Sequence, residues 1–138
     1  MTAVHCDSYA DARNNLKNLL DAAESGMVAT VRRDSASMAV LDAGRLRCFL
    51  ASVVPSRARV VQESDGWSVF IPGLRIAADG KAFDDAITEM IDALREYAFD
   101  WQDHLLSAPN HRENWGLVQL IGLSDDAQLR EWIAGPAQ

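Results

Sequence analysis

The sequence predicts an α+β protein made of two small modules in tandem. Short β-prone runs alternate with stretches whose apolar residues recur every three or four positions, and a Val-Pro-Ser segment at residues 54–56 interrupts this pattern. The 138 residues, 15.2 kDa in mass, are also within the size of one domain, and 49% hydrophobic residues suffice to bury a core. A large multidomain enzyme is excluded.

The first module, residues 1–54, is predicted to run β-α-β-β-α. Residues 3–6 are a short strand candidate, and Ser8 stands three residues before Asp11, as in a capping box that starts a helix. Gly26 ends that helix, because glycine readily adopts the left-handed conformation found after a helix. The apolar stripe of the helix consists of Tyr9, Ala12, Leu16, Leu19, Leu20 and Ala23.

A hairpin and a second helix complete the first module. Residues 27–33 are β-prone, residues 34–37 favour a turn, and residues 38–41 can return antiparallel to the first strand. Asp42 then caps a helix that is predicted to extend to about residue 51.

The second module, residues 57–138, is predicted to open β-β-β-α. Strands are expected at residues 58–62, 67–71 and 75–78. A long helix from Phe83 follows, and Asp84 and Asp85 lie in its first turn, where the helix dipole favours acids. Its apolar positions are Phe83, Ala86, Ile87, Met90, Ile91, Leu94 and Ala98.

The end of the chain is predicted to add a strand and a helix. Residues 105–114 are polar and loop-like, residues 115–121 favour a strand, and Ser124 is expected to cap a terminal helix that ends near residues 135–136. The chain shows no internal repeat.

Charge divides the two modules. The formal charge of the whole chain is −7, and residues 1–55 hold six basic and six acidic side chains, so residues 56–138 carry the entire excess. An acidic chain is normally a poor nucleic-acid binder, since phosphate neutralisation supplies most non-specific affinity. A separate basic cluster in the first module could still bind nucleic acid, because its charge is not cancelled locally by the acidic second module.

Targeting and redox signals are absent from the sequence. The longest mostly apolar stretch, residues 49–55, is far shorter than the roughly 20 residues that span a bilayer, and no signal-peptide pattern opens the chain. We therefore expect a cytoplasmic protein in which Cys6 and Cys48 are reduced, small core residues.

The first module resembles the Phd/YefM family of antitoxins. The matching features are the helix with Tyr9, Ala12, Arg13 and Leu16, the acidic-x-Gly helix end at Gly26, the Arg32-Arg33 hairpin and the Ala39-Val40 strand. Asp34 and Met38 stand where the family usually has glycine and proline. The resemblance implies a dimer that binds operator DNA, represses its own operon and neutralises a co-encoded toxin.

That resemblance also implies residue roles. The DNA-binding residues would be Ser8, Tyr9, Arg13, Asn14, Lys17, Arg32 and Arg33, and the dimerisation residues Leu16, Leu19, Leu20, Val31 and Val40. Physically, Arg13 and Lys17 share one helix edge at i and i+4, and a hairpin arginine pair can reach phosphates. The alternative interpretation is a solvated face, with Asp21 as the partner of Lys17 and Asp34 as the partner of the arginine pair.

The second module is similar to a HicB-type domain, which has a partial RNase H-like fold. Residues 66–74 match its Gly-aromatic-x-Val-x-x-Pro-x-Leu pattern, and Gly80 and Ala86 match its helix start. Lys81 and Ala82 replace the usual Asp-Thr. The resemblance implies a toxin-binding or oligomerising domain without nuclease activity.

No catalytic, metal or cofactor site is predicted. Asp84, Asp85 and Glu89 are better explained as partners of the helix dipole than as metal ligands, and His104 and His111 as surface histidines. His5 beside Cys6 has no third partner for nucleophilic catalysis, and no glycine-rich phosphate loop is present. The four tryptophans, all in the second module, suit a core with one exposed partner contact.

The leading hypothesis is an antitoxin and autorepressor whose acidic second module contacts a toxin. One alternative is a transcriptional repressor with a C-terminal ligand-sensing or oligomerisation domain and no toxin partner. Others are a degenerate RNase H-like enzyme dependent on Asp84, and an oligomerisation module without nucleic-acid contact. The toxin family, its binding residues and the operator are not readable from the sequence.

Overall fold

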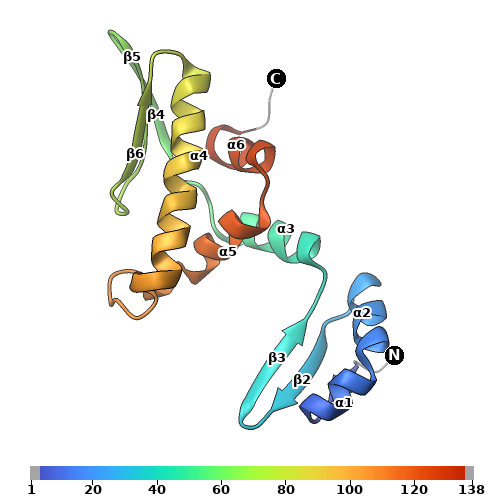
Figure 1. Ribbon diagram of the computed structural model, residues 1–138. Coiled ribbons are helices and arrows are strands. Elements are labelled where there is room, and N and C mark those ends of the chain that lie inside the picture. Colours follow the sequence, from blue (N-terminus) through green and yellow to red (C-terminus); the bar gives the residue numbers. More distant parts are fainter. Residues whose placement is uncertain (1–3, 136–138) are drawn as a thin grey trace. The chain divides into compact units, whose positions relative to one another are not determined.

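The structure, a computed structural model, describes residues 4–135. In this range the chain forms two three-stranded β-sheets and six α-helices, which confirms the α+β class (Figure 1). The finer Phd/YefM-like and HicB-like arrangement stays a prediction.

The N-terminal sheet has the order β1-β2-β3. The short strand β1 (His5–Cys6) runs parallel to β2 (Ala29–Arg33), which pairs antiparallel with β3 (Ala36–Val40). Only Asp34 and Ser35 join β2 to β3, so the turn is shorter than the predicted 34–37. Asp34 adopts a φ of 53°, a left-handed conformation that aspartate tolerates better than most residues.

The predicted N-terminal helix is divided at Asn15 into α1 (Tyr9–Asn14) and α2 (Leu16–Glu24). Asn15 donates side-chain hydrogen bonds to the carbonyl oxygen of Asp11 at 2.9 Å and to its carboxylate at 3.0 Å. Such local side-chain bonding competes with the helical ladder and explains the break. The predicted helix start is confirmed, because the Ser8 hydroxyl accepts a hydrogen bond from the Asp11 N–H at 3.1 Å.

Helix α3 (Ala43–Val53) follows the hairpin, as predicted, and extends about one half-turn further than expected. The Asp42 carboxylate accepts a hydrogen bond from the Arg45 N–H at 2.9 Å and so caps the helix. On the other side of the hairpin, Gly26 has a φ of 98° and closes α2, also as predicted.

The second sheet is an antiparallel meander of β4 (Arg59–Glu63), β5 (Gly66–Ile71) and β6 (Ile76–Gly80). All three predicted strands are confirmed with small shifts of their ends. Alternation along β5 turns Val69 and Ile71 toward the core, and both are buried.

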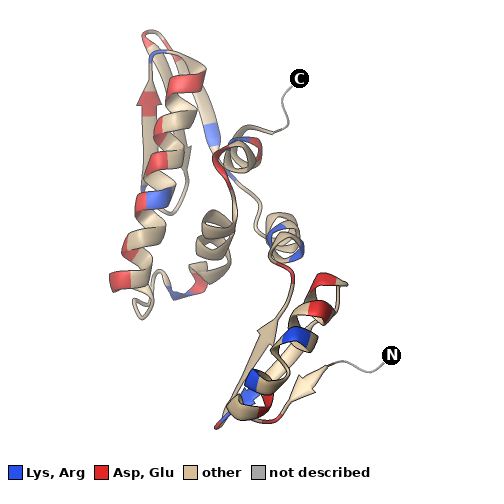
Figure 2. Ribbon diagram, turned by 45° about the vertical axis from the view of Figure 1, so that its right-hand side comes forward, with Lys and Arg blue, Asp and Glu red and all other residues tan. Residues whose placement is uncertain are grey.

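Helix α4 (Phe83–Asp100) covers one face of this sheet, and α5 and α6 lie against the helix on its far side (Figure 1). The predicted apolar stripe is confirmed, since its central members are buried: Ala86, Ile87, Met90, Ile91 and Leu94. Acidic residues recur along the remaining surface of the helix (Figure 2).

The start of α4 approaches β6 so closely that glycine is required there. A Cβ atom on Gly80 would lie 2.3 Å from the backbone nitrogen of Ala86, and one on Gly66 would lie 2.5 Å from the carbonyl oxygen of Gly80. Neither backbone atom can move aside as a flexible side chain can. Gly80 therefore lets α4 contact β6, and Gly66 lets the ends of β5 and β6 lie close together.

The strand predicted over residues 115–121 is wrong, because this segment forms helix α5 (Trp115–Leu123). Its buried residues, Leu117, Val118, Leu120 and Ile121, follow the spacing of a helix face. A short, almost wholly apolar run fits a buried helix as well as a buried strand, so periodicity alone could not decide.

Helix α6 (Asp126–Ala134) starts at a different cap from the one predicted. The Asp125 carboxylate accepts a hydrogen bond from the Gln128 N–H at 2.8 Å, and the Gln128 side chain accepts one from the Asp125 N–H at 2.9 Å. Ser124 is buried instead, and its hydroxyl donates to the carbonyl oxygen of Leu120 at 2.6 Å. Helix α6 ends just before the predicted end, whose last residue lies outside the described range.

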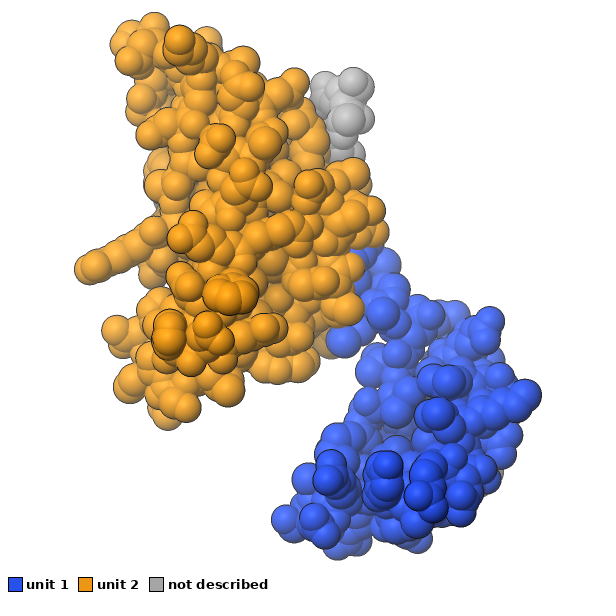
Figure 3. Space-filling model, viewed as in Figure 1, with its two compact units in different colours: residues 1–48 blue, residues 49–138 orange. Residues whose placement is uncertain are grey.

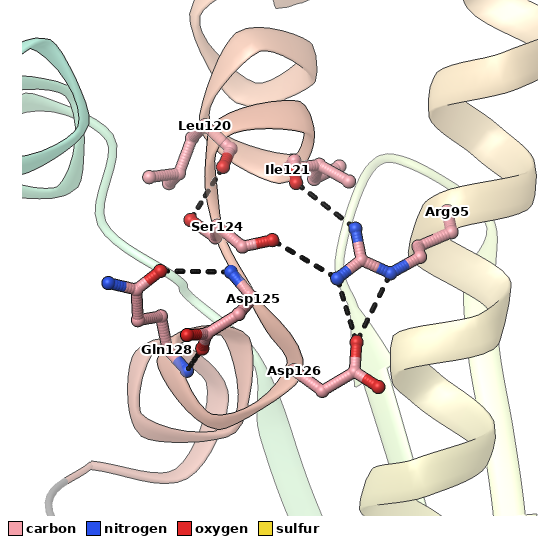
Figure 4. A network of polar contacts seen from close by, with 7 residues as sticks. All are labelled: Arg95, Leu120, Ile121, Ser124, Asp125, Asp126 and Gln128. Atoms are coloured by element: carbon pink, nitrogen blue, oxygen red, sulfur yellow. Dashed lines mark hydrogen bonds and ion pairs between the residues drawn. The ribbon is translucent and has the colours of Figure 1, made fainter. Parts of the chain in front are cut away.

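Arg95 of α4 links the end of α5 to the start of α6 through hydrogen bonds and an ion pair (Figure 4). Its guanidinium donates to the carbonyl oxygens of Ile121 at 3.2 Å and Ser124 at 3.1 Å, and it pairs with the Asp126 carboxylate at 2.7 Å. Both carbonyls lie at the C-terminal end of α5, where the regular helical hydrogen bonds stop, and the Ile121 carbonyl also accepts the Ser124 N–H at 3.3 Å. One side chain thus satisfies the end of one helix and pairs with the start of the next.

The chain divides into two compact units, residues 1–48 (unit 1) and residues 49–138 (unit 2), coloured separately in Figure 3. The division falls within α3, whereas the sequence indicated a boundary at residues 54–56. Unit 2 has an extensive core between its sheet, α4, α5 and α6. Unit 1 has a cluster of only three buried residues, Cys6, Leu19 and Ala29.

Two side-chain predictions are wrong in detail. Cys48 is exposed rather than part of a core, while Cys6 is buried as predicted. His111 is not a surface histidine, because its Nδ1 lies 3.0 Å from the Tyr97 hydroxyl and its carbonyl oxygen accepts from the Trp101 indole at 2.9 Å. These contacts hold the loop between the π-helical turn η1 (Trp101–Leu105) and the short 3-10 helix η2 (Arg112–Asn114) against α4.

None of the helices in the described range combines the length and apolar character needed to cross a bilayer.

The Gly80 contact predicts a large effect of one methyl group. Gly80→Ala should lower the free energy of unfolding by about 3 kcal/mol, because the new Cβ meets a fixed backbone atom. Urea unfolding followed by tryptophan fluorescence measures this. Gly122→Ala in α5 is the matched control, since a Cβ there meets nothing within 4 Å. It should leave stability unchanged or raise it by about 0.5–1 kcal/mol. Equal unfolding midpoints for the two variants would contradict the packing described.

The two thiols should differ in reactivity. Burial, together with the nearby carboxylates of Asp11 and Asp7, raises the pKa of the Cys6 thiol, whereas Cys48 is exposed. We expect an aromatic disulfide reagent to modify one thiol of the native protein, with Cys6 at least about a hundredfold slower. Cys48→Ser should remove the fast phase, and Cys6→Ser should retain it. A fast phase that survives Cys48→Ser would show that β1 is accessible in the native state.

Candidate nucleic-acid interface

Three of the predicted DNA-binding residues meet at the exposed side of α1. The guanidinium carbon of Arg13 lies 6.0 Å from the centre of the Tyr9 ring, and that of Arg33 lies 5.9 Å from it. Tyr9 is 62% exposed. We call Tyr9, Arg13 and Arg33 the Tyr9 cluster.

Local structure explains why these residues meet. The Ser8 cap makes Tyr9 the first residue of α1, and Arg13 follows one turn later on the same side of the helix. Arg33 is the last residue of β2, at the hairpin end. An arginine near the face of an aromatic ring at an exposed site contributes about 0.5–1 kcal/mol, so Tyr9 restrains two cations that are otherwise free to move.

The other predicted DNA-binding residues lie apart from the Tyr9 cluster. Arg32 alternates with Arg33 along β2, so the two side chains leave opposite faces of the sheet. Ser8 is engaged as the helix cap, and Asn14 is exposed at the end of α1. Lys17 donates a hydrogen bond to Asp21 at 2.8 Å, and this bond and the carboxylate charge raise the pKa of Lys17.

Lys17 differs from Arg32 and Arg33 in having an ion-pair partner within the described range. The alternative interpretation of Lys17 as a paired surface residue is supported by its contact with Asp21. Asp34 forms no ion pair with Arg32 or Arg33 among residues 4–135. The hairpin arginines thus keep their charge available to a phosphate, whereas Lys17 already has a partner.

The predicted dimerisation residues fall into two groups. Leu19 is buried in the core of unit 1, and Val31 and Val40 pack against that core. Leu16 and Leu20, one turn apart on α2, are 53% and 52% exposed. The sequence pattern identified all five as apolar and could not separate the core of the unit from its exposed side.

Several of the acidic and histidine residues considered for catalysis or metal binding have structural partners. Asp84 pairs with Arg130, and the Asp85 carboxylate accepts a hydrogen bond from the Ala82 N–H at the start of α4. His5 bonds to Thr30 at 2.6 Å and to Asp7 at 2.8 Å. Within residues 4–135, no group of three or more His, Cys, Asp or Glu side chains is arranged to hold a metal ion.

Unit 2 contains a groove whose lining residues the sequence did not indicate. The groove, of about 430 Å³, lies beside the segment that follows α3 and is lined by residues as distant in sequence as Arg57, Asn110 and Trp132. Arg57 has a φ of 52°, a backbone conformation that no sequence signal at this position indicates. Trp115, at the start of α5, is the exposed tryptophan of the four.

Comparison with known proteins assigns the chain to a family. A family model described as the antitoxin of a toxin–antitoxin, RelE/RelB, TA system, named PHD-like, matches residues 4–135 and so spans both units. The chain resembles the crystal structure of an antitoxin assigned to a toxin/antitoxin system from Syntrophomonas wolfei subsp. wolfei, with a TM-score of 0.77, 18% identity and 96% of each chain covered. No curated protein matches the chain.

The structural likeness, at this identity, shows a shared fold over nearly the whole of both chains. The family match adds the functional class, because it covers the described residues from end to end. The chain therefore belongs to the PHD-like family of toxin–antitoxin antitoxins.

Proposed function

We propose that this antitoxin neutralises a co-encoded toxin through unit 2 and represses its own operon by binding DNA as a dimer through unit 1. The observation that carries the proposal is the antitoxin family match across both units. An antitoxin acts by binding rather than by catalysis, which agrees with the structural partners found for the acidic and histidine side chains.

The DNA-binding part is supported by the charges of unit 1. Its six basic and six acidic residues give no net charge, in contrast with the −7 of the remaining chain. The Tyr9 cluster concentrates two arginines at one exposed site, with Arg32 nearby in sequence on the same hairpin. Arginines held in this way suit phosphate contacts and bidentate contacts to guanine.

Dimerisation is supported by the small core of unit 1. A 48-residue unit whose described buried residues are one leucine, one cysteine and three alanines falls in the size range where a single core contributes little stability. Leu16 and Leu20 lie on α2 at i and i+4 and expose more than half of their side chains. Covering these leucines with the same residues of a second copy would complete the core and double the arginine sites.

Toxin binding is assigned to unit 2 on electrostatic grounds. Five exposed acidic residues follow one side of α4, at spacings of three or four positions: Asp85, Glu89, Asp92, Glu96 and Asp100. Within residues 4–135, none of these five carboxylates forms an ion pair. A toxin that acts on RNA or nucleotides would carry a basic active site, which this surface would attract and cover.

The DNA-binding part is tested on the DNA immediately upstream of the gene. We expect selective, salt-sensitive binding in a gel-shift titration, and about a tenfold loss of affinity for Arg13→Ala or Arg33→Ala. Tyr9→Ala should also weaken binding, although it changes no charge, because it removes the ring that both arginines contact. Arg45→Ala, in α3 and outside the cluster, is the control for charge alone. Equal losses for Arg45→Ala and Arg33→Ala would contradict a specific role for the Tyr9 cluster.

The toxin-binding part is tested by co-expression with the neighbouring gene, followed by measurement of association rates. The triple variant Glu89→Gln, Asp92→Asn, Glu96→Gln should associate about tenfold more slowly at low salt, because steering by charge is lost. The control variant Glu63→Gln, Asp65→Asn, Glu113→Gln removes the same charge from exposed sites elsewhere in unit 2. Failure of the wild-type protein to capture the neighbouring gene product would contradict the antitoxin assignment. Equal slowing by both triple variants would contradict the role of α4.

A further inference from the structure

The groove in unit 2 has the size and lining of a site for a small ligand. Its volume of about 430 Å³ is within the roughly 300–1,000 Å³ typical of ligand pockets. Its walls are about equally polar and apolar, and the apolar part includes Pro55, Pro72, Leu74 and the ring of Trp132. The Trp132 indole N–H already donates to the carbonyl oxygen of Val54 at 2.9 Å, so this side chain offers a ligand its apolar surface.

Three polar side chains that line the groove, Ser56, Arg57 and Asn110, can donate hydrogen bonds. Arg57 carries a guanidinium, and Asn110 has a side-chain amide. The Ser56 hydroxyl accepts a hydrogen bond from the Ala58 N–H at 3.1 Å and so keeps its own proton available to donate. A ligand that presents acceptors can therefore bind all three, while the Asn114 amide nitrogen already donates to the Tyr97 hydroxyl at 2.8 Å.

The charge of the lining is opposite to that of the unit. Unit 2 contains the whole −7 excess of the chain, yet the described residues that line the groove include Arg57 and no Asp or Glu. Arg57 forms no ion pair among residues 4–135. The described lining therefore carries one positive side chain and no negative one, on a unit that is otherwise acidic.

Backbone conformation at the groove is unusual as well. Arg57 has a φ of 52° and Gly73 a φ of 90°, and Arg75, just beyond the lining residue Leu74, has a φ of 54°. Left-handed conformations of residues other than glycine cost free energy and tend to occur at binding sites. Here they occur in two segments that contribute to the lining, one after α3 and one between β5 and β6.

We propose that this groove binds a small organic carboxylate with an apolar body, whose carboxylate pairs with Arg57 and whose body packs on Trp132, Leu74 and the two prolines. The pairing is charge-assisted and can be bidentate, which gives the ligand both affinity and orientation. This proposal does not rest on toxin or DNA binding.

The test uses the full-length protein with 4-phenylbutyrate as the probe and 4-phenyl-1-butanol as its uncharged counterpart. Two-dimensional NMR follows the Trp132 indole N–H and the Asn114 side-chain amide, both at the groove. We expect saturable shifts with a dissociation constant on the order of 1 mM for the acid, and at least about tenfold weaker binding of the alcohol.

Two variants locate the carboxylate. Arg57→Gln should weaken binding of the acid about tenfold and leave that of the alcohol unchanged, and Asn110→Asp should act similarly through repulsion. Arg59→Gln, which removes the same charge from an exposed strand position outside the groove, should have no effect. Spectra of the free variants that match the wild type elsewhere confirm that the fold is retained.

Three outcomes would overturn the proposal. These are the absence of saturable shifts with either probe, equal affinity for the acid and the alcohol, and equal effects of Arg57→Gln and Arg59→Gln. Because the readout is direct binding by the free protein, none of these outcomes depends on whether a toxin or an operator is found.

Discussion

The contact between β6 and the first turn of α4 is the constraint on which unit 2 depends. Gly80 lets the backbone of the sheet contact the backbone of the helix at Ala86. This contact fixes the distance between α4 and the sheet, and so the position of Ile87, Met90 and Leu94 in the core. Once α4 is placed, its opposite side positions Arg95, which in turn holds the corner between α5 and α6. The groove beside Trp132 is a result of the same packing, since α6 contributes that residue to the lining.

Unit 1 is organised differently, around polar contacts more than around a core. The Ser8 cap, the Asn15 side-chain bonds and the Asp42 cap each fix the start or end of a helix with little apolar burial behind them. In this setting an exposed ring such as Tyr9 has an organising effect, because it restrains arginines from two separate elements. In unit 1, contacts with the Tyr9 ring position the arginines. In unit 2, the spacing of acidic residues along α4 brings their charges to one side of the helix.

The sequence predicted an element correctly where one local pattern indicated it and no other pattern fitted the same residues. The alternation of β5, the stripe of α4 and the caps at Ser8 and Asp42 each predicted an element that the structure contains. Residues 115–121 were placed in a strand because their apolar run fits both periods, and packing against α4 decided in favour of a helix. For the site, helix spacing predicted that Arg13 and Lys17 share one helix edge, whereas the break at Asn15 places them on different helices. The approach of Arg33 and the groove at Arg57 depend on tertiary contacts and backbone angles that no local pattern encodes.

The small core of unit 1 has a consequence for how long the protein survives in a cell. A unit with five buried residues in its described part, three of them alanines, is expected to open more often than one with the core of unit 2, and proteases act on the open form. If a second copy covers Leu16 and Leu20, the rate of degradation falls as the concentration rises. The lifetime of the antitoxin would then depend on its own abundance, so an interruption of synthesis would be amplified by faster removal of the copies that remain.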